Sequence, residues 1–196
     1  FLLAAEKRLD GTAALAAKGL LFVQMYGVYE FTVNAVVRAA VDSINAHAQP
    51  IHKLRHSLLA LFLHPQLESI RNVEKRKHWE SRMRLFERSC STTVVMAPNN
   101  VIPSNGDSYR HTRLQLIFDV LGIDGLPAPS EAHLNRIDEV VENRNAIAHG
   151  TETPEDVGGR YSHVDISHRI LQVKEVCLFL IEATENHCAD SSHFCR

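Results

Sequence analysis

The sequence lacks most features that would set it apart from ordinary globular proteins. Its four cysteines form no C-x-x-C pair, which argues against a disulfide-stapled scaffold and favours a reduced setting. Apolar stretches are interrupted by Arg, Asn, Asp or His before about 18 residues, so no membrane span is expected. There is no signal-peptide pattern, internal repeat or low-complexity segment. We therefore expect one cytoplasmic domain over residues 1–196, without membrane contact.

A strong excess of charge of either sign is also missing. The formal net charge is −2, so the chain is no general binder of polyanions, and any nucleic-acid contact must use a local patch. Residues 71–88 carry seven Lys or Arg against three Glu. Arg71, Lys75 and Arg82 are the candidates for RNA phosphate contacts there, although a solvated, salt-bridged helix face is the commoner meaning of such a run. Trp79 could stack on a base, but we expect it to be partly buried.

Glycine and proline gather in a few linkers, and the segments between them have apolar residues at helical spacing. This pattern predicts an all-α helical bundle. Residues 91–96 are β-branched and predict one short strand or an extended segment, and residues 151–161 are expected to form a loop. The predicted parts are long N-terminal helices in residues 1–50, a charged helix in 66–89, a further helix in 130–149, a last core helix in 166–187 and a tail in 188–196.

Twelve histidines raise the question of a metal site. The densest group is His187, Cys188, His193 and Cys195, whose spacing matches no standard zinc pattern. No H-E-x-x-H motif is present either, which disfavours a metal hydrolase. We expect no metal or other cofactor, and a frayed polar tail at these residues.

The run Arg-Asn-Ala-Ile-Ala-His-Gly at residues 144–150 carries the most chemistry. Cleavage of RNA without a metal needs a group that moves protons near neutral pH, which His149 can supply. It also needs a fixed cation on the phosphate as negative charge develops, which Arg144 can supply. The nucleophile can be the 2′-hydroxyl of the RNA itself.

The spacing alone is weak support for this chemistry. With 15 Arg and 12 His in the chain, about 0.9 R-x4-H matches are expected by chance, and there is one. Positions five apart on a helix are offset by about 140° around its axis, so Arg144 and His149 do not share a face. Two copies around a two-fold axis would be needed to gather both pairs. The alternative is that His149 interacts with the helix dipole and Arg144 pairs with a carboxylate. A looser spacing also admits Arg71 with His78.

The run from Arg144 to His149 resembles the R-x4-6-H signature of the HEPN superfamily, in the form Arg-Asn-x-x-x-His. The segment 26–30, Tyr-Gly-Val-Tyr-Glu, resembles the early-helix Tyr/Phe-Glu element of the MAE-like HEPN branch. Residues 116–124 resemble the helix and Leu-Gly-Ile turn that precede the motif helix in that branch. These elements occur in the same order over nearly the whole chain, and the pair Arg71 and His78 lacks this context.

The resemblance implies a HEPN-like helical bundle that forms a homodimer, with two motifs lining one cleft. It implies a metal-independent endoribonuclease that leaves a 2′,3′-cyclic phosphate and acts as a toxin or an anti-phage defence effector, with an antitoxin or defence-system partner protein. By match, Arg144 stabilises the phosphate, His149 is the general acid and base, and Asn145 orients a phosphate or the histidine. Glu30 matches an early acidic position, where a catalytic role and a structural ion pair or hydrogen bond both stay open.

Two further points follow from the resemblance. Some HEPN toxins carry a tyrosine two residues after the histidine, which a partner enzyme modifies with nucleotides; this chain has Thr151 there, which puts neutralisation by that route in doubt. HEPN-like bundles also serve as non-catalytic interaction or RNA-binding modules in larger defence complexes. The intact Arg-Asn-x-x-x-His set argues against that alternative. We expect Tyr26 and Tyr29 to be core or dimer-interface residues.

Overall fold

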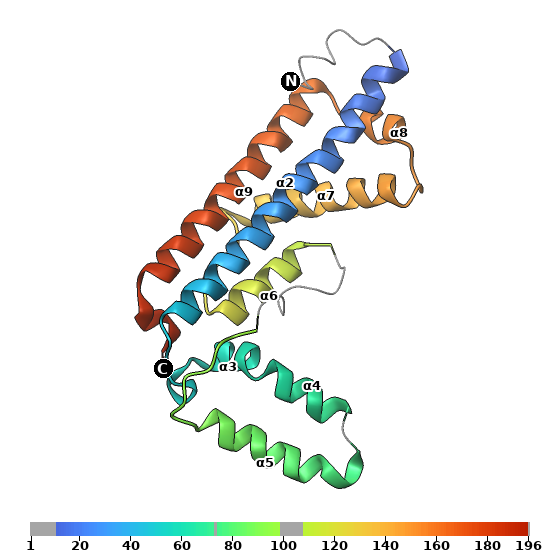
Figure 1. Ribbon diagram of the computed structural model, residues 1–196. Helices are drawn as coiled ribbons and strands as arrows, with labels where there is room; N and C mark the ends of the chain where they lie inside the picture. Colours follow the sequence, from blue (N-terminus) through green and yellow to red (C-terminus); the bar gives the residue numbers. More distant parts are fainter. Residues whose placement is uncertain (1–10, 73, 99–107, 196) are drawn as a thin grey trace. The chain divides into compact units, whose positions relative to one another are not determined.

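The computed structural model describes residues 11–72, 74–98 and 108–195 (Figure 1). Within these ranges the regular structure is helical, and two isolated bridges, Pro50 with Val94 and Leu54 with Cys195, are the only β-type pairings. The prediction of an all-α helical fold is confirmed. The α-helices are α2 (Gly11–Ala46), α3 (His56–Phe62), α4 (His64–Asn72), α5 (His78–Ser89), α6 (His111–Leu121), α7 (Glu131–Ala148), α8 (Pro154–Gly159) and α9 (His163–Ala189).

Two segments differ from the sequence prediction, and a third adopts only one of its two predicted forms. The charged helix expected over residues 66–89 is divided into α4 and α5 by a 3-10 turn at Lys75–Lys77. This turn has three consecutive cations, which repel one another, and no apolar residue that could pack, so a continuous helix is disfavoured there. Of the two alternatives for residues 91–96, the strand does not form. Val94 makes the bridge with Pro50, and the carbonyls of Ser91 and Thr93 accept the N–H groups of His52 and Ile51 at 3.3 and 3.1 Å. The loop expected over residues 151–161 contains α8, whose N-cap Thr153 forms a reciprocal capping box with Asp156.

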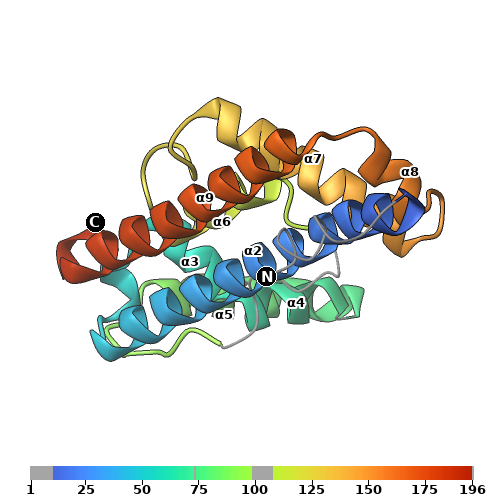
Figure 2. The same cartoon turned by 90° about the horizontal axis from the view of Figure 1, so that it is seen from above.

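The chain divides into two compact units, and the single domain predicted over 1–196 stays a prediction. The first unit holds the described residues of Phe1–Asn34, Ser108–Gln115 and Leu126–Ile181. In it the N-terminal part of α2 and most of α9 run side by side, as both views show (Figures 1 and 2). Its fully buried side chains come from α2, α7, α8 and α9: Phe22, Tyr29, Val33, Ile137, Val140, Val141, Val157, Ile166, Val176 and Leu180.

The second unit holds the described residues of Ala35–Asp107, Leu116–Gly125 and Glu182–Arg196. Its C-terminal residues are packed, because Phe194 is fully buried and its carbonyl accepts the Arg55 N–H at 2.9 Å. His187 bonds the Leu121 carbonyl at 3.1 Å and stacks on His193 with 4.9 Å between ring centroids. Burial, with the nearby His193, lowers the pKa of His187. The frayed tail predicted for residues 188–196 is therefore wrong as far as residue 195.

Helix α2 is long and apolar enough to cross a membrane by length and composition, with a mean hydropathy of 1.3 over its most apolar window. In the structure 44% of that window is buried. The buried residues of α2 include Phe22, Tyr26 and Tyr29, which belong to the core of the first unit. A core helix meets the same criteria as a membrane span, so the hydropathy of α2 has a sufficient explanation in its packing.

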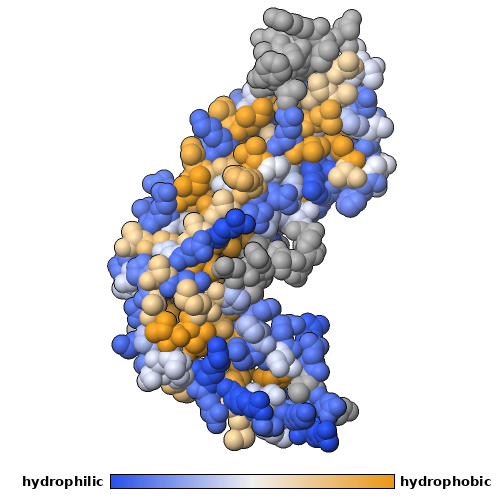
Figure 3. All heavy atoms as spheres, in the orientation of Figure 1, coloured by the Kyte–Doolittle hydropathy of each residue, from blue (hydrophilic) through white to orange (hydrophobic). Residues whose placement is uncertain are grey.

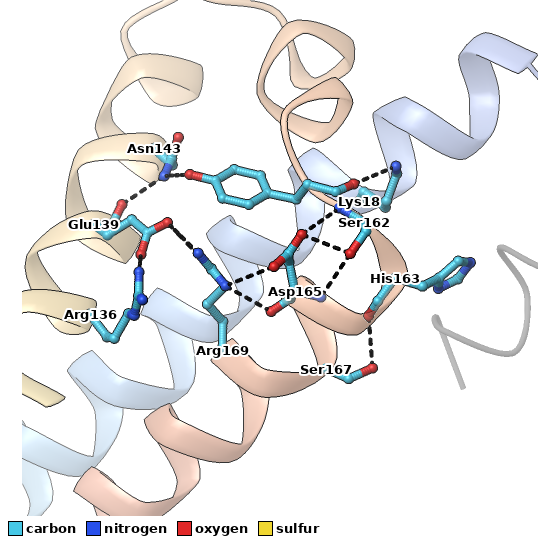
Figure 4. Close-up of polar contacts among 10 residues, drawn as sticks. Lys18, Arg136, Glu139, Asn143, Ser162, His163, Asp165, Ser167 and Arg169 are labelled. Atoms are coloured by element: carbon cyan, nitrogen blue, oxygen red, sulfur yellow. Dashed lines mark hydrogen bonds and ion pairs between the residues drawn. The ribbon is translucent and has the colours of Figure 1, made fainter. Parts of the chain in front are cut away.

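An ion cluster ties α7 to the start of α9 (Figure 4). Arg169 is 11% exposed and lies between Glu139, at 3.0 Å, and Asp165, at 3.6 Å. Glu139 also accepts a hydrogen bond from Arg136 at 2.7 Å. Although burial opposes it, these hydrogen bonds lower the pKa of Glu139, so the carboxylate stays ionised. The cluster holds the middle of α7 in place one to two turns before the Arg144–His149 motif.

Helices α2 and α8 meet through glycine. A Cβ on Gly158 would lie 1.9 Å from the Leu15 carbonyl oxygen and 2.8 Å from the Gly19 nitrogen. A Cβ on Gly19 would lie 2.0 Å from the Pro154 carbonyl oxygen. All of these atoms are backbone, so no side-chain rotation could relieve the overlap. The contact therefore needs glycine on both helices, and it fixes the segment that follows α7.

We expect Gly158→Ala to lower the free energy of unfolding by about 3 kcal/mol, because a backbone-to-backbone contact would have to open. Gly159→Ala is the matched control, since a Cβ there meets nothing within 4 Å. It should leave stability within about 1 kcal/mol of the parent. Urea unfolding of the three proteins measures both effects, and equal stability of the two variants would contradict the close contact.

Candidate functional site

Arg144 is held on α7 by two contacts. The half-buried guanidinium lies over the Tyr26 ring, with 4.3 Å between its central carbon and the ring centroid. Its Nη1 donates to Asn145 Oδ1 at 2.8 Å. An arginine has five N–H donors, and this hydrogen bond uses one of them. The cation is therefore positioned while it keeps donors that a phosphate could accept.

Tyr26 links Arg144 to Glu30. The tyrosine is 2% exposed, and its hydroxyl donates to Glu30 Oε1 at 3.0 Å and accepts the Tyr109 N–H at 3.4 Å. Burial, with the charge of Glu30 and its hydrogen bond, raises the pKa of Tyr26, and the Tyr109 N–H and Arg144 offset part of that rise. The hydroxyl therefore stays protonated at neutral pH and remains a donor.

Glu30 takes part in a hydrogen-bonded chain along α2. Besides accepting from Tyr26, it accepts the Asn34 side-chain N–H on its main-chain carbonyl at 2.9 Å. Asn34 in turn accepts the Tyr109 hydroxyl at 2.8 Å. No ion pair of Glu30 with another described residue is found. The sequence left open a structural ion pair or a structural hydrogen bond for Glu30, and the structure shows the hydrogen bond. A catalytic role of Glu30 stays a prediction.

Asn145 connects the motif to the segment before α6. Its Oδ1 accepts hydrogen bonds from Arg144 and from the Ser108 hydroxyl, the latter at 3.2 Å. Its main-chain carbonyl accepts the His149 N–H at 2.9 Å. The Asn145 side chain thus orients the guanidinium rather than the imidazole.

His149 is the exposed C-cap residue of α7. The chain reverses after it because Gly150 has φ +69°, and the N–H groups of Gly150 and Thr151 donate to the carbonyls of Ile147 and Ala146 at 3.1 and 3.0 Å. These bonds form a Schellman motif, as expected for glycine at this position. No hydrogen bond or ion pair joins the imidazole to another part of the described chain. The ring is therefore open to solvent and to a substrate.

A pocket of about 410 Å³ lies beside the motif, but neither Arg144 nor His149 lines it. Three glutamates and one arginine line it, and this balance of charge disfavours an RNA phosphate. Its lining residues are Glu139, Glu142, Asn143, Ala146, Thr151, Glu152, Arg160 and Tyr161. Among the described residues, no three His, Cys, Asp or Glu side chains gather as metal ligands would.

The residues predicted to bind RNA lie in the second unit, whereas Glu30, Arg144, Asn145 and His149 lie in the first. Arg71 is exposed on α4 and 3.9 Å from Glu68. Arg82 is exposed on α5, with its guanidinium 5.1 Å from the centroid of the Trp79 ring. The Lys75 side chain lies outside what the structure describes. Trp79 is 72% exposed, so the expectation that it is partly buried is wrong.

The sequence analysis missed the part that Tyr26 takes in the site. The spacing of Tyr26 and Glu30, four residues apart on one helix, is a signal for their hydrogen bond. The contact of Tyr26 with Arg144 joins residues 118 positions apart, and no local pattern indicates it. Tyr109 and Ser108 likewise reach the site only through tertiary packing.

Two substitutions at Tyr26 separate the contacts it makes. Tyr26→Phe keeps the ring under Arg144 and removes the hydrogen bond to Glu30, so we expect a loss of about 1 kcal/mol in stability and an unchanged Arg144 position. Tyr26→Leu removes the ring as well, and we expect a further loss of about 2 kcal/mol and a mobile Arg144 side chain. Urea unfolding and the NMR signal of the Arg144 Nε–H measure these effects; a rigid Arg144 in Tyr26→Leu would contradict them.

A comparison with protein families identifies the family of the chain. The RiboL-PSP-HEPN family model matches residues 3–190. No curated protein and no solved structure matches the chain significantly. The MAE-like branch inferred from residues 26–30 and 116–124 stays a prediction. Because the family model covers nearly the whole chain, the protein belongs to the RiboL-PSP-HEPN family of the HEPN superfamily, whose domains are commonly ribonucleases.

Proposed function

We propose that the chain is a metal-independent endoribonuclease whose catalytic residues are Arg144 and His149. The substrate is RNA, and the site is completed by a second copy of the chain. We further propose that it acts in the cytoplasm as a toxin or anti-phage effector, under the control of an antitoxin or a defence-system partner protein. The proposal begins from the family, in which ribonuclease activity is common.

The reaction needs only the RNA and these side chains. A neutral His149 takes the proton of the 2′-hydroxyl, the 2′-oxygen attacks the adjacent phosphorus, and the bond to the 5′-oxygen breaks. A protonated His149 of the second copy gives its proton to the leaving 5′-oxygen. Arg144 donates hydrogen bonds to the phosphate as its negative charge grows. The products are a 2′,3′-cyclic phosphate and a 5′-hydroxyl.

The observation that carries the proposal is the contrast between the two motif residues. Arg144 is fixed by Tyr26 and Asn145, as an electrostatic stabiliser should be. His149 is exposed at the end of α7, and its ring makes no hydrogen bond with the described residues. A histidine with a purely structural role would be expected to use a ring nitrogen in the fold, as His133 does with Ser130 and Glu175.

We expect Arg144→Ala and His149→Ala each to lower RNA cleavage by about 10²- to 10⁴-fold, because they remove the phosphate-stabilising cation and the proton carrier. Cleavage of total RNA by purified protein in EDTA, with mapping of the ends, measures this. Parent protein should remain active in EDTA and leave 2′,3′-cyclic phosphate ends.

His64→Ala is a matched control, since His64 lies at the start of α4, outside the motif. It should cleave RNA at the parental rate. Inhibition of the parent by EDTA, reversed by a divalent metal, would refute the mechanism. Intact RNA with the parent protein, under conditions in which it is folded, would favour the non-catalytic interaction module.

Helix geometry supports the proposal that the site uses a second copy. Arg144 lies in α7 against Tyr26, whereas His149 caps the helix end, about 140° further round its axis. An exposed apolar stripe supplies a surface for pairing: Val164, Leu171 and Leu178 recur every seven residues on α9 and are 62%, 53% and 54% exposed. Figure 3 shows apolar side chains on the surface along α2 and α9. A heptad-spaced stripe of this kind suits an antiparallel helix pair.

We expect Leu171→Glu, at the middle of the stripe, to convert a dimer to a monomer and to abolish RNA cleavage, since two like charges would meet near the two-fold axis. Leu116→Glu is the control, because Leu116 is similarly exposed, at 49%, but lies on α6. Light scattering gives the mass of each protein. A parent protein that is monomeric and still cleaves RNA would contradict the composite site.

A further inference from the structure

Helix α5 carries an exposed apolar stripe that the fold does not use. Trp79, Met83 and Phe86 recur at helical spacing and are 72%, 62% and 69% exposed. At 100° per residue they lie within about 60° of one another around the helix axis. Neither α4 nor α5 contains a buried residue. Three large apolar side chains on one open face are unusual on a protein surface and mark a site of interaction.

One side of the stripe carries positive charge. Arg82 lies on the same face, with its guanidinium 5.1 Å from the Trp79 ring centroid. The turn Lys75–Lys77 precedes the helix directly. The acidic residues of α5, Glu80 and Glu87, lie on a neighbouring flank, and Glu80 is paired with Arg84. The stripe therefore presents flat aromatic rings next to cations.

This combination fits unpaired nucleic acid better than a protein helix. Bases that are not paired expose flat faces that stack on aromatic rings and on guanidinium planes, while their phosphates are drawn to Lys and Arg. Trp79 and Phe86 are seven residues apart, or about 10.5 Å along α5, which is about three steps of base stacking at 3.4 Å. A double helix keeps its base faces stacked inside and offers none to these rings.

We propose that α5 is a binding platform for single-stranded RNA, with Trp79 and Phe86 stacking on bases and Arg82 on base or phosphate. This proposal rests on the ribonuclease function proposed above. Together they make unpaired RNA the substrate class of this protein. Met83 lies between these two residues along the same face of α5. The platform lies in the second compact unit, separate in sequence from the residues of the cleavage motif.

Trp79 is the only tryptophan in the chain, so its fluorescence reports directly on the platform. The probe is a mixed-sequence 12-nucleotide 2′-O-methyl RNA, which lacks the hydroxyl needed for cleavage. We expect it to quench the emission of the parent protein, and the same oligonucleotide in a duplex to leave the emission unchanged. Phe86→Ala and Arg82→Ala should each weaken binding at least about fivefold, as expected for the loss of one stacking contact.

Phe31→Ala is the matched control, because Phe31 is a phenylalanine of similar exposure, 76%, on α2. It should bind like the parent. No quenching, equal binding of single strand and duplex, or an equal loss in Phe31→Ala would overturn the platform. So would a blue shift with phosphatidylglycerol vesicles in the absence of any response to RNA, which would assign the stripe to a membrane surface. Binding of the 2′-O-methyl RNA without cleavage of ordinary RNA would uphold the platform while refuting the nuclease.

Discussion

The contact of the Tyr26 ring with the Arg144 guanidinium is the interaction on which the arrangement of the site depends. The ring is buried in the core of the first unit, its hydroxyl bonds Glu30, and its face holds the cation. A phenylalanine could fill the core and hold Arg144, but it would leave Glu30 without this donor. The cation–π energy itself is modest, about 0.5–2 kcal/mol, yet it restricts a long side chain that would otherwise sample many rotamers. The burial of Tyr26 on α2 therefore stabilises the fold and also fixes the ring that positions the Arg144 guanidinium on α7.

At the end of α7, in contrast to Arg144, the His149 side chain is not held by the fold. The Schellman motif at Gly150 fixes the backbone of His149 and leaves its ring in solvent. The next segment is anchored by the capping box of α8 and by the glycine contact between α8 and α2. The backbone on both sides of His149 is therefore ordered although its side chain makes no hydrogen bond within the described chain. This contrast suits the proposed roles of the two residues. The Arg144 cation is held in place in advance, which favours stabilisation of charge on the phosphate. The His149 imidazole is accessible, which proton transfer to and from a substrate requires.

The sequence predicted those parts of the structure that local chemistry determines. The range of α7 agrees with the expected helix to within one residue at each end, because Ser130 and Gly150 are strong boundary signals. Helix α8 was missed because Gly158 and Gly159 favour a loop, whereas Gly158 is needed for close packing on α2. The exposure of Trp79 could not be predicted either, since a tryptophan on an amphipathic helix is usually covered. The contacts of Tyr26 and Ser108 with the motif depend on tertiary packing, which helical periodicity does not encode.

The distribution of charge bears on the role proposed for the aromatic side chains of α5 in RNA binding. The chain carries a net charge of −2 and residues 71–88 carry +4, so the other residues together carry −6 and repel a polyanion. Within and beside the basic segment, Arg71, Arg76 and Arg84 are each paired with a glutamate, which reduces the charge free to meet phosphates. Electrostatic attraction alone would then be weak and easily screened by salt. In the proposed platform, exposed Trp79 and Phe86 supply an attraction to unpaired bases that salt does not screen. This role would give a reason for apolar rings kept in solvent on α5, the most basic of the described helices.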